Sequence, residues 1–399
     1  MMTKLGILTT HPVQYQVPWF RALTDAGVDL TVFYCLIPDA REQGDGFGVP
    51  FQWDIPLLDG YRYEVLRNVA REPSVTRFTG CDTPGIRDVV RSGRFDAFVV
   101  NGWRVKSCLQ LLVACRLHGV PCLVRGESNG IRRRPLVKRL LHRILLHQYA
   151  AVLAIGRENR TFYTTNGVPE HRIFSTPYCV DNRRFSEAAD RFSQDRNALR
   201  MLWGISRDAC VFLFSGKLVA KKRPADFIEA LAQCIGNGVP VDRVHGLVVG
   251  DGELMTQCRK LATARGLPVS FAGFMNQSEI PAAYACSDGL VLPSDEGETW
   301  GLVVNEAMAC GLPAIVSDRV GCRADLVEDG ETGCVFPMGD VAALGRAMAG
   351  MAGDEGRRKK MGANARKRIE AYSYDRVVEG TLKALSFSLR NVTREGGRT

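Results

Sequence analysis

The sequence predicts an α/β protein with two doubly wound parallel-sheet domains. Short apolar segments, typical of strands buried on both faces, alternate with helical patterns along the chain. Its 399 residues exceed what one hydrophobic core usually serves. The polar stretch 183–200 interrupts the alternation and is interpreted as an interdomain linker. We therefore expect domains over residues 1–185 and 200–375, followed by a helix and tail over 376–399.

The first domain begins with a βαβ unit. Lys4–Thr9 is a short apolar strand, a helix ends near Gly27, and Leu30–Tyr34 is the next strand. The first turn lacks the G-x-G-x-x-G pattern that cradles a pyrophosphate, which argues against a dinucleotide site there. Residues 38–80, rich in Gly, Pro and charge, predict hairpins or loops that could cover an acceptor site. Further strands are predicted at Ala97–Val100, Val120–Val124 and Ala151–Ile155, and helices at Val105–Leu117 and Pro135–Gln148.

The second domain alternates more regularly, as a doubly wound sheet requires. Its strands are predicted at Cys210–Phe214, Gly246–Val249, Val269–Ala272, Gly289–Leu292, Ala314–Val316 and Cys334–Phe336. Its helices are predicted at Pro224–Ile235, Glu253–Arg265, Gln277–Ala285, Gly301–Cys310 and Val341–Ala352. Two helical patterns, Glu355–Tyr372 and Asp375–Asn391, end the chain.

Composition indicates a cytoplasmic globular protein. Hydrophobic residues make up 46% of the chain, yet no apolar stretch reaches the ~20 residues of a membrane span, and the first strand is too short for a signal peptide core. The 13 cysteines form no C-x-x-C pair. They predict buried free thiols in a reducing compartment, with no structural metal and no disulfide framework.

Charge is distributed unevenly. Residues 1–200 hold 28 Lys and Arg against 19 Asp and Glu, whereas residues 201–399 hold 24 of each, so the net charge of +9 lies in the first half. Such asymmetry favours an anionic partner for that half, and by itself it fits a membrane surface, a phosphorylated acceptor or nucleic acid.

The predicted helix from Leu136 is amphipathic and basic. Leu136, Val137, Leu140, Leu141, Ile144 and Leu145 fall on one half of its helical wheel, opposite Lys138, Arg139, His142 and Arg143. Together with Arg132–Arg134, the segment 132–148 suits an anionic membrane, which would place the protein on the inner membrane face. The alternative is that the apolar face packs on the helix's own sheet.

Polar residues follow two predicted strands of the first domain. His11 and Gln14 come after the first strand, and Arg125 and Glu127 come after Val120–Val124. In open α/β sheets ligands bind at the carboxyl ends of strands, which makes these residues acceptor or cleft candidates. The alternatives are a satisfied loop histidine at position 11 and a simple ion pair between Arg125 and Glu127.

Two carboxylates flank a glycine where a predicted helix follows a buried strand. Glu298 lies in the loop, Gly301 opens the helix and Glu306 lies within it. The N–H groups of Trp300, Gly301 and Leu302 would face an anion such as a phosphate. Carboxylates accept hydrogen bonds from the hydroxyls of a sugar or ribose, so this context predicts a nucleotide-sugar site.

Spacing alone does not identify this site. Glu64 and Glu72 have the same separation as Glu298 and Glu306, but no buried strand precedes them and no glycine opens a helix between them. We interpret Glu64 and Glu72 as two solvated charges.

Three further loops follow strands of the second domain. Gly216, Lys217 and Lys222 lie after Cys210–Phe214, and two ammonium groups there would neutralise a diphosphate and stabilise a departing nucleotide. The alternative is a solvated basic loop. Gly250 follows the next strand, and Gly273 and Phe274 follow the third, where backbone groups could read a base edge.

These motifs occur in a known order. Gly-Lys-Leu-x-x-x-Lys from Gly216, Val-Gly-Asp-Gly from Val249, Ala-Gly-Phe from Ala272, and the long Pro-Ser to Gly-x-Pro run over 293–313 together resemble the donor domain of retaining GT-B glycosyltransferases of the family 4 type. The resemblance covers about residues 210–375. It departs at Lys217, where the family usually has Arg, and in the first domain, where His11–Gln14 replaces a Gly-Gly turn.

The resemblance implies a GT-B fold with two Rossmann-like domains facing across a cleft, and a last helix that crosses back to the first domain. It implies that Glu298 holds sugar hydroxyls, Glu306 the ribose, Thr299–Leu302 the diphosphate, and Lys217 with Lys222 the phosphate charge. The implied activity is a hexosyltransferase-type transfer, with retention, from a nucleotide-diphosphate sugar to a glycan, lipid or small-molecule acceptor. The sequence has no Asp-x-Asp, so we expect no metal-bridged diphosphate. We also expect no cofactor and no nucleic-acid partner.

Two alternatives fit the same motifs. A GT-B nucleotide-sugar epimerase would use an acid and base pair on the donor without an acceptor. A non-catalytic module would bind nucleotide-sugars or an anionic glycolipid without turnover, although the presence of both carboxylates and both lysines argues against lost activity.

Overall fold

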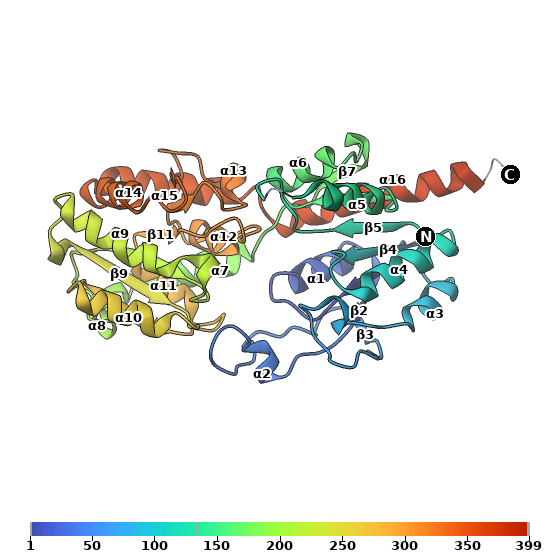
Figure 1. The fold of residues 1–399 in the computed structure, drawn as a ribbon, viewed down its shortest axis with the longest axis horizontal. Helices are drawn as coiled ribbons and strands as arrows, with labels where there is room; N and C mark the ends of the chain where they lie inside the picture. Colours follow the sequence, from blue (N-terminus) through green and yellow to red (C-terminus); the bar gives the residue numbers. More distant parts are fainter. Residues whose placement is uncertain (1, 133, 397–399) are drawn as a thin grey trace. The chain divides into compact units, whose positions relative to one another are not determined.

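The computed structural model describes residues 2–132 and 134–396, which form two compact units (Figure 1). Unit 1 contains the described residues up to Pro38, Pro56–Tyr178 and the residues from Tyr374 onward. Unit 2 contains Asp39–Ile55 and Cys179–Ser373. The chain therefore passes between the units four times. We call Asp39–Ile55, the part of unit 2 that comes from the first half of the chain, the strap.

Unit 1 is built on a seven-stranded parallel sheet with the order β3-β2-β1-β4-β5-β6-β7. Its strands are β1 (Lys4–Thr9), β2 (Asp29–Tyr34), β3 (Arg62–Val65), β4 (Ala97–Asn101), β5 (Cys122–Arg125), β6 (Ala151–Ala154) and β7 (Ile173–Ser175). Its helices are α1 (Val17–Asp25), α3 (Ile86–Arg91), α4 (Lys106–Leu117), α5 (Leu136–Leu146), α6 (Arg157–Thr165) and α16 (Tyr374–Gly396). Leu8, Phe33, Val100 and Val124 lie in its buried core.

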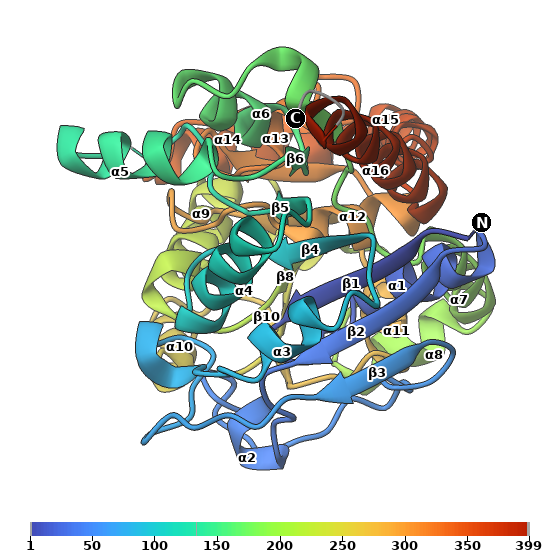
Figure 2. The ribbon, with the colours of Figure 1, turned by 90° about the vertical axis from the view of Figure 1, so that its right-hand side faces the viewer.

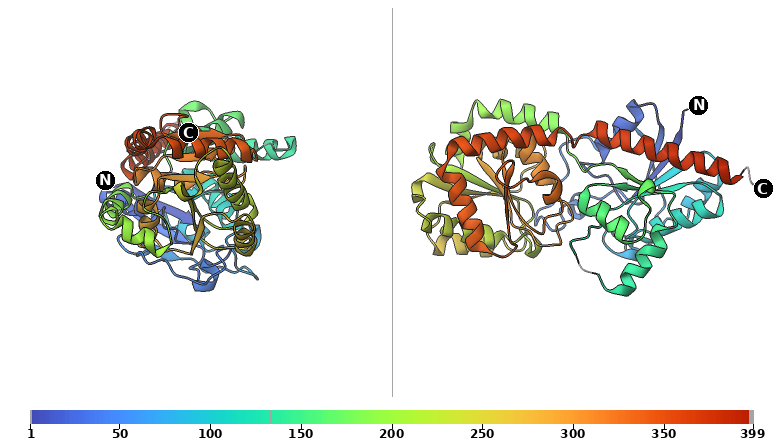
Figure 3. Two further views of the ribbon diagram at one scale, coloured as in Figure 1. Left: turned by 90° about the vertical axis from the view of Figure 1, so that its left-hand side faces the viewer. Right: turned by 90° about the horizontal axis from the view of Figure 1, so that it is seen from above.

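Helix α16 returns the end of the chain to unit 1. It packs against α1, β6 and β7, and Figure 3 shows it in red along this unit. The Tyr374 hydroxyl at its start donates to the Tyr15 carbonyl (3.1 Å). The helix that the family resemblance implied is therefore present.

Unit 2 is built on a six-stranded parallel sheet with the order β10-β9-β8-β11-β12-β13. Its strands are β8 (Cys210–Ser215), β9 (Val244–Val249), β10 (Val269–Gly273), β11 (Gly289–Leu292), β12 (Ala314–Ser317) and β13 (Gly333–Phe336). Its helices are α2 (Ala40–Gln43), α7 (Asn182–Ser193), α8 (Arg196–Leu202), α9 (Pro224–Gly236), α10 (Met255–Ala264), α11 (Ile280–Cys286), α12 (Leu302–Ala309), α13 (Arg323–Leu326), α14 (Val341–Gly353) and α15 (Glu355–Ile369). The predicted α/β class and both parallel sheets are confirmed. Every residue of β8 is buried, which explains its uniformly apolar sequence.

The linker prediction was wrong. Residues 183–200 belong to α7 and α8 of unit 2, and α7 packs on α11 and α12. Phe185, Ala188 and Ala189 are buried along one face of α7, and the Asp181 side chain caps its first turn by accepting from the Arg184 N–H (2.9 Å). The prediction failed because the segment is mostly polar, and only these three apolar side chains, at helical spacing, indicate a buried face.

The segment 38–80 consists mostly of loops, one of the two predicted alternatives, but it also contains α2 and a strand. Its one described strand, β3, pairs with β2 in parallel. Parallel strands need a crossover, which the strap and the residues up to Tyr61 supply. The strap begins with α2, where Asp39 and Glu42 form a reciprocal capping box.

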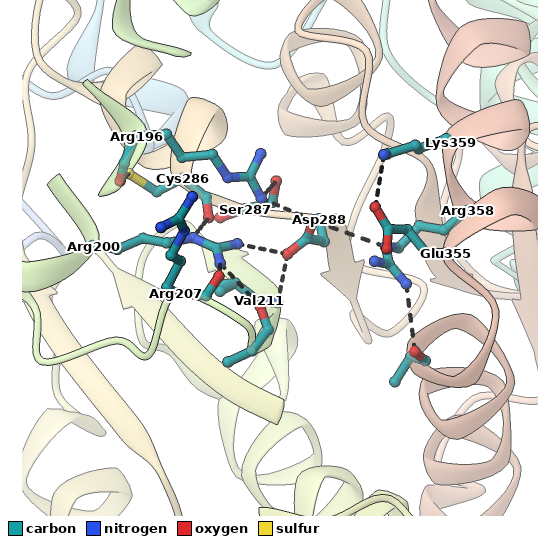
Figure 4. Close-up of polar contacts among 12 residues, drawn as sticks. Arg196, Arg200, Arg207, Val211, Cys286, Ser287, Asp288, Glu355, Arg358 and Lys359 are labelled. Atoms are coloured by element: carbon teal, nitrogen blue, oxygen red, sulfur yellow. Dashed lines mark hydrogen bonds and ion pairs between the residues drawn. The ribbon is translucent and has the colours of Figure 1, made fainter. Parts of the chain in front are cut away.

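A partly buried carboxylate joins several elements at the end of the sheet of unit 2 where β11 begins (Figure 4). Asp288 pairs with Arg196 (2.8 Å) and Arg200 (2.8 Å) of α8 on one side, and lies 3.8 Å from Arg358 of α15 on the other. It also accepts the Val211 N–H of β8 (2.8 Å). Asp288 therefore connects α8 and α15 to the central strands β8 and β11.

All 13 cysteines are free, and 11 of them are buried. Burial raises the thiol pKa of several of them, including that of Cys108 to about 12. The prediction of buried free thiols is confirmed.

Candidate functional site

The strand order of unit 2 places a switch point between β8 and β11. Strands β9 and β10 continue from β8 in one direction, and β12 and β13 continue from β11 in the other. Ligands of open α/β sheets bind in the crevice outside the carboxyl ends of the strands at this point. The loop with Lys217 and Lys222 follows β8, and the loop with Glu298 follows β11.

Three glycines connect the carboxyl ends of neighbouring strands. The Gly216 N–H donates to the Val249 carbonyl (3.0 Å), and the Gly250 N–H donates to the Gly273 carbonyl (2.7 Å). Gly216, Gly250 and Gly273 all have positive φ, and a Cβ on Gly250 would lie 2.0 Å from the Gly216 carbonyl oxygen. Side chains are thus excluded, and the strand ends form a backbone surface that a flat ligand can approach.

Lys222 and Glu298 lie together. The Lys222 ammonium pairs with Glu298 Oε2, and both side chains are largely buried. Ser294 Oγ lies 3.5 Å from the same carboxylate oxygen, within donating distance. The loops after β8 and β11 therefore bring one ammonium and one carboxylate to a shared position, as their sequence positions predicted.

Lys217, also in the loop after β8, contacts the strap. Its ammonium donates to the Asp45 carbonyl and lies 4.2 Å from the centre of the Phe47 ring. Burial lowers its pKa from the usual value, and the nearby Lys221 and Lys222 contribute in the same direction.

Glu306 is buried within α12. Its Oε2 accepts the Tyr284 hydroxyl (2.6 Å), and burial raises its pKa to about 7. At neutral pH this carboxyl group is therefore poised between its two protonation states. Glu64 and Glu72, which share the eight-residue spacing, are both exposed, so their interpretation as solvated charges is confirmed.

Thr299–Leu302 form the entry to α12. Gly301 caps the helix with a φ of 102°, and a Cβ there would lie 2.8 Å from Leu292 Cδ2. The Trp300 indole donates to Asn305 Oδ1 (2.8 Å), so its side chain faces the protein. The Val304 N–H donates to the Gly301 carbonyl (2.9 Å), and the N–H groups that open a helix are suited to an anion.

In unit 1, His11 and Gln14 follow β1 at the second switch point, between β1 and β4. Both are half-buried. His11 Nδ1 lies 2.9 Å from Thr10 Oγ1, and burial lowers the His11 pKa to about 4. His11 is therefore neutral at pH 7.

Arg125 and Glu127 have different surroundings. The Arg125 guanidinium is buried between the rings of Trp19 (4.8 Å) and Tyr178 (4.5 Å) and donates to the Thr176 carbonyl (3.2 Å). Glu127 accepts the hydroxyls of Tyr15 (3.2 Å) and Tyr178. These contacts give Arg125 a place in the interior of unit 1.

Comparison with known proteins decides the family. Residues 195–368 match the family described as "Glycosyl transferases group 1". Residues 12–179 match the family described as "Glycosyl transferase 4-like domain". The D-inositol 3-phosphate glycosyltransferase of Geodermatophilus obscurus is 30% identical over 396 residues, which cover 93% of this chain and 83% of that protein. The chain belongs to the glycosyl transferases group 1 family, of the family 4 type.

Two further relatives agree with this assignment. The glycosyltransferase is 38% identical to the Arabidopsis thaliana sulfoquinovosyl transferase SQD2 over 335 residues, which cover 82% of this chain and 59% of that one. The structure of Anabaena HepE in complex with UDP has a TM-score of 0.71 and 19% identity, and it covers 96% of this chain and all of its own. This likeness confirms the GT-B fold.

Several polar residues near the two switch points of the glycosyltransferase were missed from the sequence. Tyr284, on α11, has an ordinary apolar context and reaches Glu306 only through the fold. In unit 1, Gln16 Oε1 accepts from Thr9 Oγ1 (3.3 Å) and Asn101 Nδ2 (3.0 Å). Asn101 directly follows the predicted strand Ala97–Val100 and is the last residue of β4, and that position was the signal that could have identified it.

The apolar face of α5 is exposed in the glycosyltransferase. Leu136, Val137, Leu140, Leu141 and Ile144 are 55–76% exposed, whereas Leu146 and the partly buried His142 face unit 1. Figure 2 shows α5 extending outward from its sheet. Leu145, the sixth residue of this face, is partly buried and packs against the core of unit 1. For the other five residues, packing on the helix's own sheet, one of the two alternatives, is wrong. Arg133 lies outside the described residues.

No described helix of the glycosyltransferase combines the length and apolarity that crossing a bilayer requires.

Proposed function

We propose that this glycosyltransferase moves a sugar from a nucleotide-diphosphate sugar to an acceptor hydroxyl, with retention of anomeric configuration and without a metal or cofactor. The observation that carries the proposal is the meeting of Lys222 with Glu298 beside the helix entry at Gly301, at the β8–β11 switch point. The UDP in the HepE structure supports the donor class, because that protein has the same fold.

The proposed donor lies across the carboxyl ends of β8 to β11. Its base faces the backbone at Gly273 and Phe274, and the Glu306 carboxyl group accepts a ribose hydroxyl. The diphosphate lies against Lys217, Lys222 and the N–H groups of Thr299–Leu302. Glu298 accepts sugar hydroxyls, and its ion pair with Lys222 orients the carboxylate.

The proposed reaction is a front-face displacement. The bond between C1 of the sugar and the diphosphate oxygen breaks while the acceptor oxygen bonds to C1 on the same face. The acceptor proton passes to an oxygen of the departing diphosphate, whose charge is stabilised by the two lysines and the first turn of α12. Glu298 positions the sugar and forms no covalent bond, so a glycosyl adduct on Glu298 in mass spectrometry would contradict this mechanism.

A donor panel tests the proposal. Wild-type protein incubated with UDP-, ADP- and GDP-sugars should slowly release the nucleoside diphosphate from one of them, and EDTA should leave the rate unchanged. With an acceptor, NMR of the product should show the donor's anomeric configuration. Isomerised sugar without an acceptor would indicate an epimerase instead, and binding without turnover would indicate a non-catalytic module.

We also propose that α5 docks the enzyme on the cytoplasmic face of an anionic membrane, where a lipid-linked or glycan acceptor is available. Its exposed apolar face is flanked by the exposed side chains of Lys138, Arg139 and Arg143. A helix with this pattern inserts its apolar side among acyl chains while its cations contact anionic headgroups. The exposed face is the supporting observation, and the net positive charge of residues 1–200 fits the same surface.

Vesicle co-sedimentation tests the membrane proposal. Wild type should sediment with vesicles containing phosphatidylglycerol and should stay in solution with pure phosphatidylcholine. Replacing Leu140 and Ile144 by Asp should abolish sedimentation. Val113→Asp, at a similarly exposed apolar residue of α4, is the matched control and should leave it unchanged. Equal, negligible binding of wild type to both vesicle types would end this proposal.

A further inference from the structure

The strap lies on donor-site residues of unit 2. It contains three glycines within five residues, Gly44, Gly46 and Gly48, and the last two have φ of +75°. A Cβ on Gly46 would lie 3.1 Å from the Lys217 ammonium. The absence of side chains at this position therefore allows the strap backbone to approach Lys217 closely.

The strap supplies the acceptor for Lys217. The Lys217 ammonium donates to the Asp45 carbonyl, and the Phe47 ring provides a cation–π contact at 4.2 Å. A neutral carbonyl and a ring face are weaker partners for an ammonium group than a diphosphate, whose oxygens form charge-assisted hydrogen bonds. The strap thus occupies Lys217 in a way that an anionic ligand can outcompete.

Aromatic residues of the strap cover Phe274. The Phe51 ring lies 4.2 Å from the Phe274 ring, centre to centre, with an interplanar angle of 35°, and the Phe47 ring lies 5.4 Å away. Trp53 packs on Phe51 at 4.9 Å. The face of Phe274 that an aromatic base could stack on is therefore taken by Phe51.

Polar contacts at the end of the strap fasten it to the loop after β10. The Asp54 carboxylate accepts the Ser278 N–H (3.0 Å) and the Ser278 hydroxyl, and Asn276 Nδ2 donates to the Gln52 carbonyl (2.7 Å). Asp54, Gln52 and Ser278 are exposed. These contacts can be removed without opening a cavity in the core.

We propose that the strap is a built-in competitor of the donor nucleotide: it holds Lys217 and Phe274 until a nucleoside diphosphate displaces it. This inference rests on the proposed donor site. Displacement exchanges the Asp45 carbonyl for phosphate oxygens at Lys217 and the Phe51 ring for the base at Phe274. The strap thereby sets donor affinity and keeps the basic loop covered when no nucleotide is bound.

Lysine acetylation tests the strap without any ligand. Lys221 is exposed in the same loop and serves as the internal reference for Lys217. Asp54→Ala removes the strap fastening and should raise acetylation of Lys217 relative to Lys221 by roughly fivefold, the effect expected when the net contribution of one ordinary exposed hydrogen bond is lost. The matched control is Asp242→Ala, at another exposed aspartate of unit 2, which should leave the ratio unchanged.

Nucleotide binding tests the competition. UDP, ADP and GDP are each titrated against wild type and Asp54→Ala, and the variant should bind the preferred nucleotide roughly fivefold more tightly. In wild type, that nucleotide should increase amide hydrogen exchange in residues 39–55. Equal affinities with an unchanged acetylation ratio would overturn the strap proposal alone. Failure of both proteins to bind any of the three nucleotides would overturn the donor proposal and the competition together.

Discussion

The protonation of the Glu306 carboxyl group is controlled by its surroundings in the fold. Burial raises its pKa to about 7, against 4.5 for the ordinary group. The folded protein therefore binds more protons here than the unfolded chain between pH 4.5 and 7, and this group lowers stability as pH rises through that window. Ionising this buried carboxyl group costs free energy when no ligand donates to it. A hydroxyl group of the proposed ribose would donate to the carboxylate and reduce that cost.

The first prediction follows from this loss of stability with rising pH. Glu306→Gln keeps an acceptor for the Tyr284 hydroxyl but cannot ionise. Above pH 7 it should be more stable than wild type by up to on the order of 3 kcal/mol, and the difference should vanish near pH 4.5. Thermal unfolding from pH 4.5 to 8.5 measures it, with Glu64→Gln as the exposed control. Parallel pH profiles for wild type and Glu306→Gln would show that burial does not perturb this carboxyl group.

The second prediction concerns the lysines after β8. Lys222→Ala should lower kcat/KM for transfer by about a hundredfold or more, because it removes charge from the departing diphosphate and leaves Glu298 without its cation. Lys217→Arg should stay within about tenfold of wild type, since the positive charge remains. Steady-state kinetics with the donor identified by the panel provides the measurement. Lys221→Ala is the control, and if it were as damaging as Lys222→Ala, the loop would act only through its total charge.

At the scale of elements, the glycine connections hold the loops at the carboxyl ends of β8, β9 and β10 together. Gly250→Ala would place a methyl group 2.0 Å from the Gly216 carbonyl oxygen and force the loops after β8 and β9 apart. We expect a loss of more than about 2 kcal/mol of unfolding free energy and a loss of donor binding. Gly238→Ala is the matched control, because Gly238 also has positive φ but has open space around it. Equal losses in chemical unfolding would assign the effect to backbone strain alone.

The ion cluster at Asp288 predicts which contact holds α8 to its unit. Asp288→Asn would leave the nearly buried guanidinium of Arg200 without its anion and should cost about 3–5 kcal/mol in urea unfolding. Glu187→Gln, which removes the exposed pair with Arg183, should cost under about 1 kcal/mol. A small, similar loss in both variants would mean that hydrogen bonds of Arg200 to backbone carbonyls, such as that of Cys286, suffice.

At the scale of the whole molecule, the sequence predicted best what is buried on both faces. The central strands of each sheet are almost uniformly apolar and were located to within a few residues. The edge strand β3, Arg-Tyr-Glu-Val, is exposed along its length and gave no apolar signal. Helix α7 was missed because its buried face consists of few apolar residues among charged ones.

The loops of the candidate site were predictable because parallel topology brings strand ends to one edge of a sheet. Lys222 and Glu298 meet for this reason, although 75 residues lie between them. The contact of Lys217 with Asp45 follows no local pattern, since the strap is separated from it by the remainder of the first half of the chain. Pairing of this kind depends on tertiary structure and lies outside what periodicity and spacing encode.

The discontinuity of unit 2 has a consequence for protein engineering. A chimera of two such glycosyltransferases joined once near residue 179 would combine the strap of one parent with the Phe274 and Lys217 positions of the other. Residues 39–55 and 179–373 should instead be exchanged together, with junctions beside Pro38 and Pro56. Donor preference, measured by nucleotide competition, should then follow the transplanted pair of segments, whereas the single-junction chimera should show an altered affinity for the same nucleotide.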